Sequence, residues 1–170
     1  MRKVVFFDLE GPLSSQDNAY EVLGLVPEGH KIFEVISKYD DILALERRPD
    51  YEAGDTLSLI APFLVAHDIQ EKDVYAVSRK AFLVGGARAM IAKLKEAGWL
   101  VYIISTSYEQ HAYNIASQLG IKEEKVKCTQ FPLDSYLAQF SSEDLDLVLK
   151  AEKEILSLYP PRDEQSIKER

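Results

Sequence analysis

A short, uninterrupted apolar segment close to the N-terminus places the strongest constraint on the fold. Residues Val4–Phe7 are all β-branched or aromatic, and the segment stops at Asp8, shortly before Gly11–Pro12. A strand without polar alternation is typical of a parallel sheet that is covered on both faces, and a Gly-Pro pair predicts a turn. The segment therefore predicts the first buried strand of an α/β fold.

Later apolar segments continue this pattern. Ala87–Ala97 has apolar residues at helical spacing and is followed by Gly98, after which Trp99–Ile104 has the composition of a second strand. Another helical stretch closes at Gly120, and Val126–Phe131 predicts a third, weaker strand. A glycine directly after the last helical residue is typical of helix ends. The alternation of helices and strands with short connections predicts a doubly wound parallel sheet.

The region between the first strand and the Ala87 helix has a different character, because short helical patterns fill it and no convincing strand interrupts them. We predict a partial α/β core over residues 1–13 and 83–135, a helical cap inserted at 14–82, and an amphipathic helix with a polar tail over 136–170. The predicted helices outside the core are Val22–Tyr39, Asp41–Arg48, Gly54–Ala66, Asp73–Phe82 and Ser141–Leu158.

The composition limits the classes of partner. The formal net charge is -8, from 28 acids and 20 bases, so we expect neither nucleic acid nor an anionic membrane as a partner. The single Cys128 excludes an internal disulfide and a cysteine-based metal site. Val4–Phe7 is too short for a signal peptide or a membrane span, so we expect a cytoplasmic protein. A phosphate substrate stays compatible with the acidic charge, because a metal ion or a helix N-terminus can bind it.

Polar residues follow two of the predicted strands. Asp8 and Glu10 follow the first strand, and Ser105, Thr106 and Ser107 follow the second. In an open parallel sheet, ligands bind beyond the carboxyl ends of the strands. These two groups are therefore the candidate site residues.

The segments that end in these residues resemble the first two motifs of the haloacid dehalogenase-like (HAD-like) hydrolase superfamily. Phe6–Leu13 is similar to the superfamily's apolar strand followed by Asp-x-Asp-Gly, and Ile103–Ser105 is similar to its apolar strand ending in Ser or Thr. A helical insert between the motifs is similar to members with a helical cap. The resemblance implies an α/β fold with a HAD-like, Rossmannoid parallel sheet, incomplete in a chain that matches the N-terminal part of such proteins.

A narrower resemblance leaves two functions open. Asp8–Pro12, Tyr39–Asp41, Tyr51–Gly54 and Ile104–Tyr108 together resemble an archaeal group of HAD-like proteins, some of which are named as a subunit of an energy-converting hydrogenase. The superfamily resemblance implies a phosphatase. The group resemblance leaves the alternative of a catalytically inactive accessory or assembly subunit that keeps the fold.

For a phosphatase, the resemblance implies Mg²⁺-dependent hydrolysis of a small phosphorylated metabolite. Asp8 would be the nucleophile that forms an aspartyl-phosphate, and Glu10 would be the general acid and base. Mg²⁺ would be held by Asp8 and by the backbone carbonyl of Glu10, where it would offset the repulsion between Asp8 and the phosphate. Ser105, or alternatively Thr106, would hold a phosphoryl oxygen by a hydrogen bond.

The sequence departs from the superfamily pattern in two ways. Glu10 stands where the superfamily usually has the shorter Asp, and the chain shows no clear counterpart of a later Lys and of a pair of Mg²⁺-binding acids at a fourth strand end. The candidates for these groups are Lys122, Lys125 and Lys127, and the acids Asp144 and Asp146 within a helical pattern.

The departures have consequences for the edge of the sheet and for the second strand end. Without a fourth strand, Val4–Phe7 would be an unprotected apolar edge, so we expect self-association through it or marginal stability. The hydroxyl residues at the second strand end have helix capping as an alternative role. Thr106 with Glu109, and Ser107 with Gln110, each fit a capping box.

Overall fold

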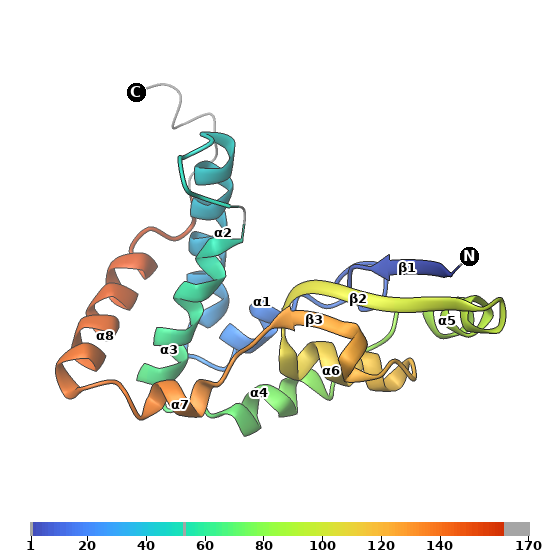
Figure 1. Cartoon of the computed structure of the whole chain (residues 1–170). Helices are drawn as coiled ribbons and strands as arrows, with labels where there is room; N and C mark the ends of the chain where they lie inside the picture. Colours follow the sequence, from blue (N-terminus) through green and yellow to red (C-terminus); the bar gives the residue numbers. More distant parts are fainter. Residues whose placement is uncertain (1, 53, 162–170) are drawn as a thin grey trace. The chain divides into compact units, whose positions relative to one another are not determined.

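The computed structural model describes residues 2–52 and 54–161, and it divides into two compact units (Figure 1). Within these residues, 2–18 and 71–132 form the first unit, and 19–70 and 133–161 form the second. Of the cap expected at 14–82, residues 19–70 lie in the second unit, and both ends of the expected range lie in the first. The second unit also includes the helix expected near the C-terminus. The polar tail expected after Pro161 lies outside the described residues.

The first unit is built on a three-stranded parallel sheet with the order β1-β2-β3. In the pairing of β1 with β2, Phe7 lies opposite Ile103. The register of β2 against β3 is irregular between Ile104 and Tyr108. The strands are β1 (Lys3–Phe7), β2 (Trp99–Tyr108) and β3 (Val126–Thr129), and β1 is an edge strand among the described residues.

Helices cover one face of this sheet. They are α4 (Glu71–Ser78), α5 (Ala87–Glu96) and α6 (Glu109–Gln118), with the short 3-10 helix η2 (Glu123–Lys125) before β3. Helix α5 contacts β2, α6 contacts β2 and β3, and α4 packs on α6. Figure 1 shows α4 and α6 on the same side of the strands. The buried core residues of this face are Leu9, Leu13, Ala81, Ala87, Ile91, Val101, Ile103, Ala112, Ile115, Ala116, Leu119, Ile121 and Val126.

The other face of the sheet is exposed within the described residues. The exposed fractions of Val4, Phe6 and Ile104 are 40%, 59% and 52%, and the rings of Phe6 and Tyr102 lie 5.4 Å apart on this face. The composition of Val4–Phe7 therefore predicted the strand correctly, but the expected burial on both faces was wrong. The reason is that successive right-handed crossovers in one direction, from β1 to β2 to β3, place their helices on the same side.

The second unit is helical. Its elements are α1 (Asn18–Leu23, with Asn18 itself in the first unit), α2 (Gly29–Leu45), the 3-10 helix η1 (Asp55–Leu59), α3 (Ile60–Ala66), α7 (Leu133–Leu137) and α8 (Ser142–Leu156). Helix α8 packs on α2 and α3, and α3 also contacts α7. The buried apolar residues of these helices include Val22, Leu23, Ile32, Ile36, Leu43, Ile60, Phe63, Leu64 and Val65.

Helix α2 replaces the two helices that the sequence predicted for its region. Val22–Tyr39 and Asp41–Arg48 were expected as separate helices, but one helix spans Gly29–Leu45. The break in the chain comes earlier, before Gly29, where a Cβ atom would lie 1.8 Å from the carbonyl oxygen of Leu23. Only glycine fits this close approach of two backbone segments, and it fixes where α2 begins.

Two polar contacts hold the second unit together beside its apolar core. Asp40 of α2 accepts hydrogen bonds from the Tyr51 hydroxyl and, at 2.9 Å, from the Gly54 N–H. His67 and Glu152 are 2.7 Å apart, which links the end of α3 to α8. In the described part of the chain, no helix combines the length and apolarity needed to cross a membrane.

Candidate active site

The candidate residues lie at one edge of the sheet in the first unit. Because β1 and β2 run parallel with Phe7 opposite Ile103, their carboxyl ends meet at this edge. Asp8 follows Phe7 directly, and Ser105 lies two residues beyond Ile103. The structure therefore brings the acids after β1 and the hydroxyl groups at the end of β2 to the same end of the sheet.

The loop after β1 is fixed by its own backbone. The carbonyl of Leu9 accepts the N–H groups of Leu13 and Ser14 at 3.1 and 2.9 Å, and the Gly11 N–H donates to the Ser14 carbonyl at 2.7 Å. Gly11 has a φ of 94°, a conformation that favours glycine. Leu9 and Leu13 are fully buried, so the acids on either side of Leu9 stand on an anchored backbone.

Asp8 is an exposed carboxylate at the end of β1. Its Oδ1 accepts the N–H of Leu9 at 2.7 Å, which fixes one oxygen of the group. A ligand can reach the carboxylate because the side chain is exposed. These are the properties that a carboxylate nucleophile needs at a rigid strand end.

Glu10 is half-buried and is held at one oxygen. Its Oε1 accepts a hydrogen bond from the Ser107 hydroxyl and another, at 3.4 Å, from the N–H of Asn18. Burial raises the pKa of Glu10, and repulsion from Asp17 and Asp8 raises it further, although both hydrogen bonds act in the opposite direction. A carboxyl group with a raised pKa keeps its proton more readily, which suits a general acid.

Ser107 belongs to the candidate group at this strand end, but the sequence predicted no role for it beyond helix capping, whereas its hydroxyl donates a hydrogen bond to Glu10. Ser105 Oγ donates to Ser107 Oγ at 3.0 Å, and the Ser107 N–H donates to Ser105 Oγ at 3.2 Å. The expected capping role was wrong, because Tyr108 is the N-cap residue of α6 and makes no side-chain capping bond. Strand β2 continues to Tyr108 instead of ending at Ile104. Alternation along this longer strand would have placed both serines on one side.

Thr106 lies apart from this group of hydroxyls. Its side chain is exposed, and its carbonyl accepts the Thr129 hydroxyl at 2.7 Å, which ties β2 to β3. Glu109 does not form the expected capping box with Thr106, since its carboxylate accepts the Phe131 N–H at 2.9 Å. The hydrogen bonds thus connect Ser105, through Ser107, to Glu10.

The lysines considered as stand-ins for the later Lys of the superfamily occupy other positions. Lys122 and Lys125 precede β3, so they lie at the amino end of this parallel strand, away from the edge that carries Asp8. Lys127 lies within β3, where it is paired with Ile104 of β2. Lys122 and Lys125 are therefore not positioned by β3 to contact the candidate site.

One of the paired acids near the C-terminus, Asp144, caps its own helix. Asp144 accepts the Ser141 N–H at 3.0 Å, and Ser141 Oγ accepts the Asp144 N–H at 3.2 Å, which forms a capping box at the start of α8. The Ser141 N–H and the Ser141 hydroxyl, which donates to Asp144 Oδ2 at 2.8 Å, lower the pKa of Asp144. Asp146 lies on the same helix, in the second unit. The helical pattern that the sequence showed for these acids is confirmed.

The donor chemistry of the site fits Mg²⁺. This ion prefers oxygen ligands, and it often takes one or two of them from the protein and the remainder from water and phosphate. Asp8 offers an exposed carboxylate, and the mutual repulsion of Asp8, Glu10 and Asp17 favours a nearby cation. Over residues 2–52 and 54–161, no three His, Cys, Asp or Glu side chains form a ready-made metal site. An ion at this edge would accordingly take further oxygens from water and the substrate.

His111 is a buried histidine on α6, close to the candidate site in the sequence. It is 1% exposed, and burial lowers its pKa to about 4, although Asp17 acts in the opposite direction. Within the described residues its Nε2 has no hydrogen-bond partner, a property it shares with the buried Ser14 Oγ, Asn18 Nδ2 and Gln110 Oε1. His111 is therefore neutral near pH 7 and serves as a packed, uncharged residue.

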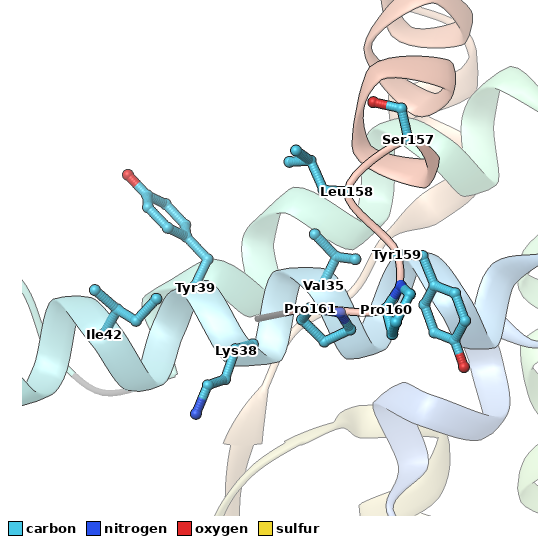
Figure 2. Close-up of a pocket in the computed structure, with 9 residues that line it drawn as sticks. All are labelled: Val35, Lys38, Tyr39, Ile42, Ser157, Leu158, Tyr159, Pro160 and Pro161. Carbon is cyan, nitrogen blue, oxygen red and sulfur yellow. The ribbon is translucent and has the colours of Figure 1, made fainter. Parts of the chain in front are cut away.

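A separate pocket lies in the second unit, between α2 and the segment after α8 (Figure 2). Its volume is about 450 Å³, and Lys38 is the one charged residue among the nine that line it. The Ser157 hydroxyl donates to the Glu154 carbonyl at 2.6 Å and is engaged in the end of α8. Because no acid lines this pocket in the described part of the chain, the pocket is not the candidate active site. Its lining residues are Val35, Lys38, Tyr39, Ile42, Ser157, Leu158, Tyr159, Pro160 and Pro161.

Fold and site together define a parallel α/β protein with an acid at the end of its first strand and hydroxyl groups at the end of the next. The chain belongs to the haloacid dehalogenase-like hydrolase family, whose profile matches residues 2–157. The resemblance drawn from Phe6–Leu13 and Ile103–Ser105 is thereby confirmed, as is the HAD-like fold class.

Solved structures agree with this assignment. The structure of gene product AF1437 from Archaeoglobus fulgidus is similar with a TM-score of 0.83 and 32% sequence identity, over 99% of this chain and 52% of that one. A phospho-aspartyl intermediate analogue of phosphoserine phosphatase has a TM-score of 0.54 and 19% identity, over 76% of this chain and 56% of that one. A substrate-bound phosphoserine phosphatase complex has the same TM-score, 0.54, with 18% identity and the same coverage of 76% and 56%.

These similarities differ in what they show. The two phosphoserine phosphatase structures share the fold at low identity and carry no further statement about this chain. The chain spans about half the length of the structures it matches. The search of curated proteins gave no significant match.

Proposed function

We propose that this chain carries the nucleophile, the general acid and a phosphate-binding hydroxyl of a phosphatase that acts on a small phosphomonoester with Mg²⁺. The observation that supports this most directly is the half-buried Glu10, held by Ser107 beside the exposed Asp8 at the carboxyl end of the sheet. Membership of a hydrolase family supports the same class of reaction. The cytoplasmic location stays a prediction from the sequence.

The residues divide the reaction into two displacements. A carboxylate oxygen of Asp8 attacks phosphorus, the bond from phosphorus to the ester oxygen breaks, and the leaving oxygen takes the proton of Glu10. Water then attacks the aspartyl-phosphate, and Glu10 accepts the proton that this water loses. Inorganic phosphate leaves, and Asp8 and protonated Glu10 are restored.

Other groups support these steps. When substrate is bound, the Ser105 hydroxyl proton turns from Ser107 Oγ to a phosphoryl oxygen, which stabilises the charge on the transferring group, while the Ser107 N–H keeps its hydrogen bond to Ser105 Oγ. Asp8 and the backbone carbonyl of Glu10 would hold Mg²⁺, which offsets the repulsion between two anions. The raised pKa of Glu10 favours the protonated form that the leaving group needs.

One observation supports the alternative, an accessory subunit with the fold but without turnover. Two of the three lysines considered for the site, Lys122 and Lys125, lie at the amino end of β3, so this strand brings neither of them to Asp8. Without a lysine to neutralise the phosphoryl group together with Mg²⁺, hydrolysis would be slow. Activity measurements separate the two proposals.

The test is hydrolysis of para-nitrophenyl phosphate by the purified chain, with and without Mg²⁺. We expect Mg²⁺-dependent turnover that EDTA abolishes and that falls by at least about 10³-fold in Asp8→Asn. Asp146→Asn is the matched control, because it removes an exposed acid on α8, and it should leave the rate unchanged. Absence of turnover with this substrate and with a broad panel of phosphomonoesters would support the accessory role instead.

A further inference from the structure

Three side chains form a continuous hydrogen-bonded chain across the two strand ends. Ser105 Oγ donates to Ser107 Oγ at 3.0 Å, and Ser107 Oγ in turn donates to Glu10 Oε1. The Ser107 N–H returns a hydrogen bond to Ser105 Oγ at 3.2 Å. Ser107 therefore lies between the hydroxyl proposed to hold phosphate and the carboxyl proposed to move the proton.

The position of Ser107 allows little movement. It is 6% exposed, it lies in β2 one residue before the strand ends, and both its hydroxyl and its N–H are engaged. A buried hydroxyl that is bonded as donor and as acceptor has one favourable rotamer, since turning it would leave a polar atom unsatisfied. Ser107 is thus a rigid support for the groups on either side.

Glu10 has more need of such support than an aspartate would. A glutamate has one more rotatable bond, and its carboxyl group must stay close to Asp8 to protonate the same phosphoryl ester. Both hydrogen bonds to the side chain, from Ser107 and from the Asn18 N–H, fall on Oε1. Oε1 is therefore the anchored oxygen, and Oε2 takes no part in these two hydrogen bonds.

We propose that Ser107 is a positioning residue, which ties Oε1 of Glu10 to Ser105 and so keeps the proton donor and the phosphate-binding hydroxyl at one fixed separation. The proposal rests on the proposed function for its kinetic consequence, but its structural part concerns only the side chain of Glu10. Ser107 itself does not touch the substrate.

The kinetic test compares Ser107→Ala with Ser107→Thr, which keeps the hydroxyl. We expect Ser107→Ala to lower kcat by about 10- to 100-fold with little change in KM, because a displaced proton donor slows the chemical step more than binding. The loss should be larger with phenyl phosphate than with para-nitrophenyl phosphate, since the poorer leaving group depends more on the acid. Ser107→Thr should restore most of the rate.

A merely structural role for Ser107 predicts a different pattern. Loss of folded protein would lower the rates with both esters by the same factor, and it would appear as a lower midpoint of urea unfolding. Equal losses with phenyl and para-nitrophenyl phosphate, or no rescue by Ser107→Thr, would overturn the proposal.

A second measurement does not require turnover. In protein with ¹³C-labelled glutamate, NMR relaxation of the Glu10 γ-methylene should show an ordered side chain in the wild type and in Ser107→Thr, and a mobile one in Ser107→Ala. If the wild type hydrolyses no phosphate ester but this pattern holds, the proposed function fails and the positioning role stands. An equally ordered Glu10 in Ser107→Ala would contradict the positioning role whatever the activity.

Discussion

Acidification should destabilise this protein through His111. The side chain is 1% exposed on α6, and burial lowers its pKa to about 4, so it stays neutral in the folded state at pH 5. In the unfolded chain a histidine has a pKa of about 6.5 and takes up a proton at that pH. Between these two values the unfolded state binds more protons, so stability rises with pH across this window and is lost as the pH falls.

The size of the effect follows from the two pKa values. Lowering the pH from 7 to 5 should reduce the free energy of unfolding by about 2 kcal/mol through this group alone. Urea unfolding at both pH values would measure the loss in the wild type and in His111→Gln, which cannot titrate. We expect the loss to be smaller by about 2 kcal/mol in the variant.

A matched control removes a histidine at an exposed position. His30→Gln makes the same substitution on α2, so it separates the buried site from the general effect of losing an imidazole. The same pH dependence in His111→Gln and in the wild type would refute the reasoning, because burial of His111 would then have no consequence for proton binding.

The remaining predictions concern the edge strand and the phosphate-binding hydroxyl. Sedimentation should show that the wild type self-associates with increasing concentration. Phe6→Lys, on the edge strand β1, should abolish this association, whereas Phe82→Lys, at a site 71% exposed outside the sheet strands, should preserve it. A wild type that stays monomeric would contradict the prediction. Ser105→Ala should lower kcat/KM by about 10- to 100-fold, because a hydrogen bond to a charged group contributes about 1.5–3 kcal/mol, whereas Thr106→Ala should change it little; the reverse order would reassign the phosphate contact.

Much of the α/β unit could be predicted from local patterns. The composition of Val4–Phe7 and of Trp99–Ile104 gave the first two strands, and the apolar spacing after Ala87 gave α5. Local patterns do not show which element, if any, packs on each face of a strand. Val4 and Phe6 are apolar like Val5, yet they lie on the uncovered side of the sheet, since the position of a strand within the sheet decides its burial.

The helical unit was predicted less completely for a related reason. An amphipathic pattern over Ser141–Leu158 shows that one face of a helix is buried, but it cannot show that the partners are α2 and α3, far away in the sequence. The start of α2 at Gly29 depends on a close approach to Leu23, a tertiary contact that single-residue preferences do not reveal.

The candidate site shows the same division. Asp8, Glu10 and Ser105 could be chosen as candidates because each belongs to a motif at a strand end, and the parallel register brings those ends together. The contact of Ser107 with Glu10 could not be predicted, since three consecutive hydroxyl residues before a helix also fit capping, and the strand continues past its apolar part to Tyr108. The hydrogen bond from Ser107 to Glu10 joins residues that are 97 positions apart.

The central claim is that Asp8 becomes phosphorylated during turnover. Rapid acid quenching of the protein with a phosphomonoester it hydrolyses, followed by proteolysis and mass spectrometry, tests this directly. We expect an alkali-labile phosphoryl group on the peptide that contains Asp8, and none in Asp8→Asn. Turnover by the wild type that leaves no phosphoryl group on Asp8, or places it on another residue, would contradict the account.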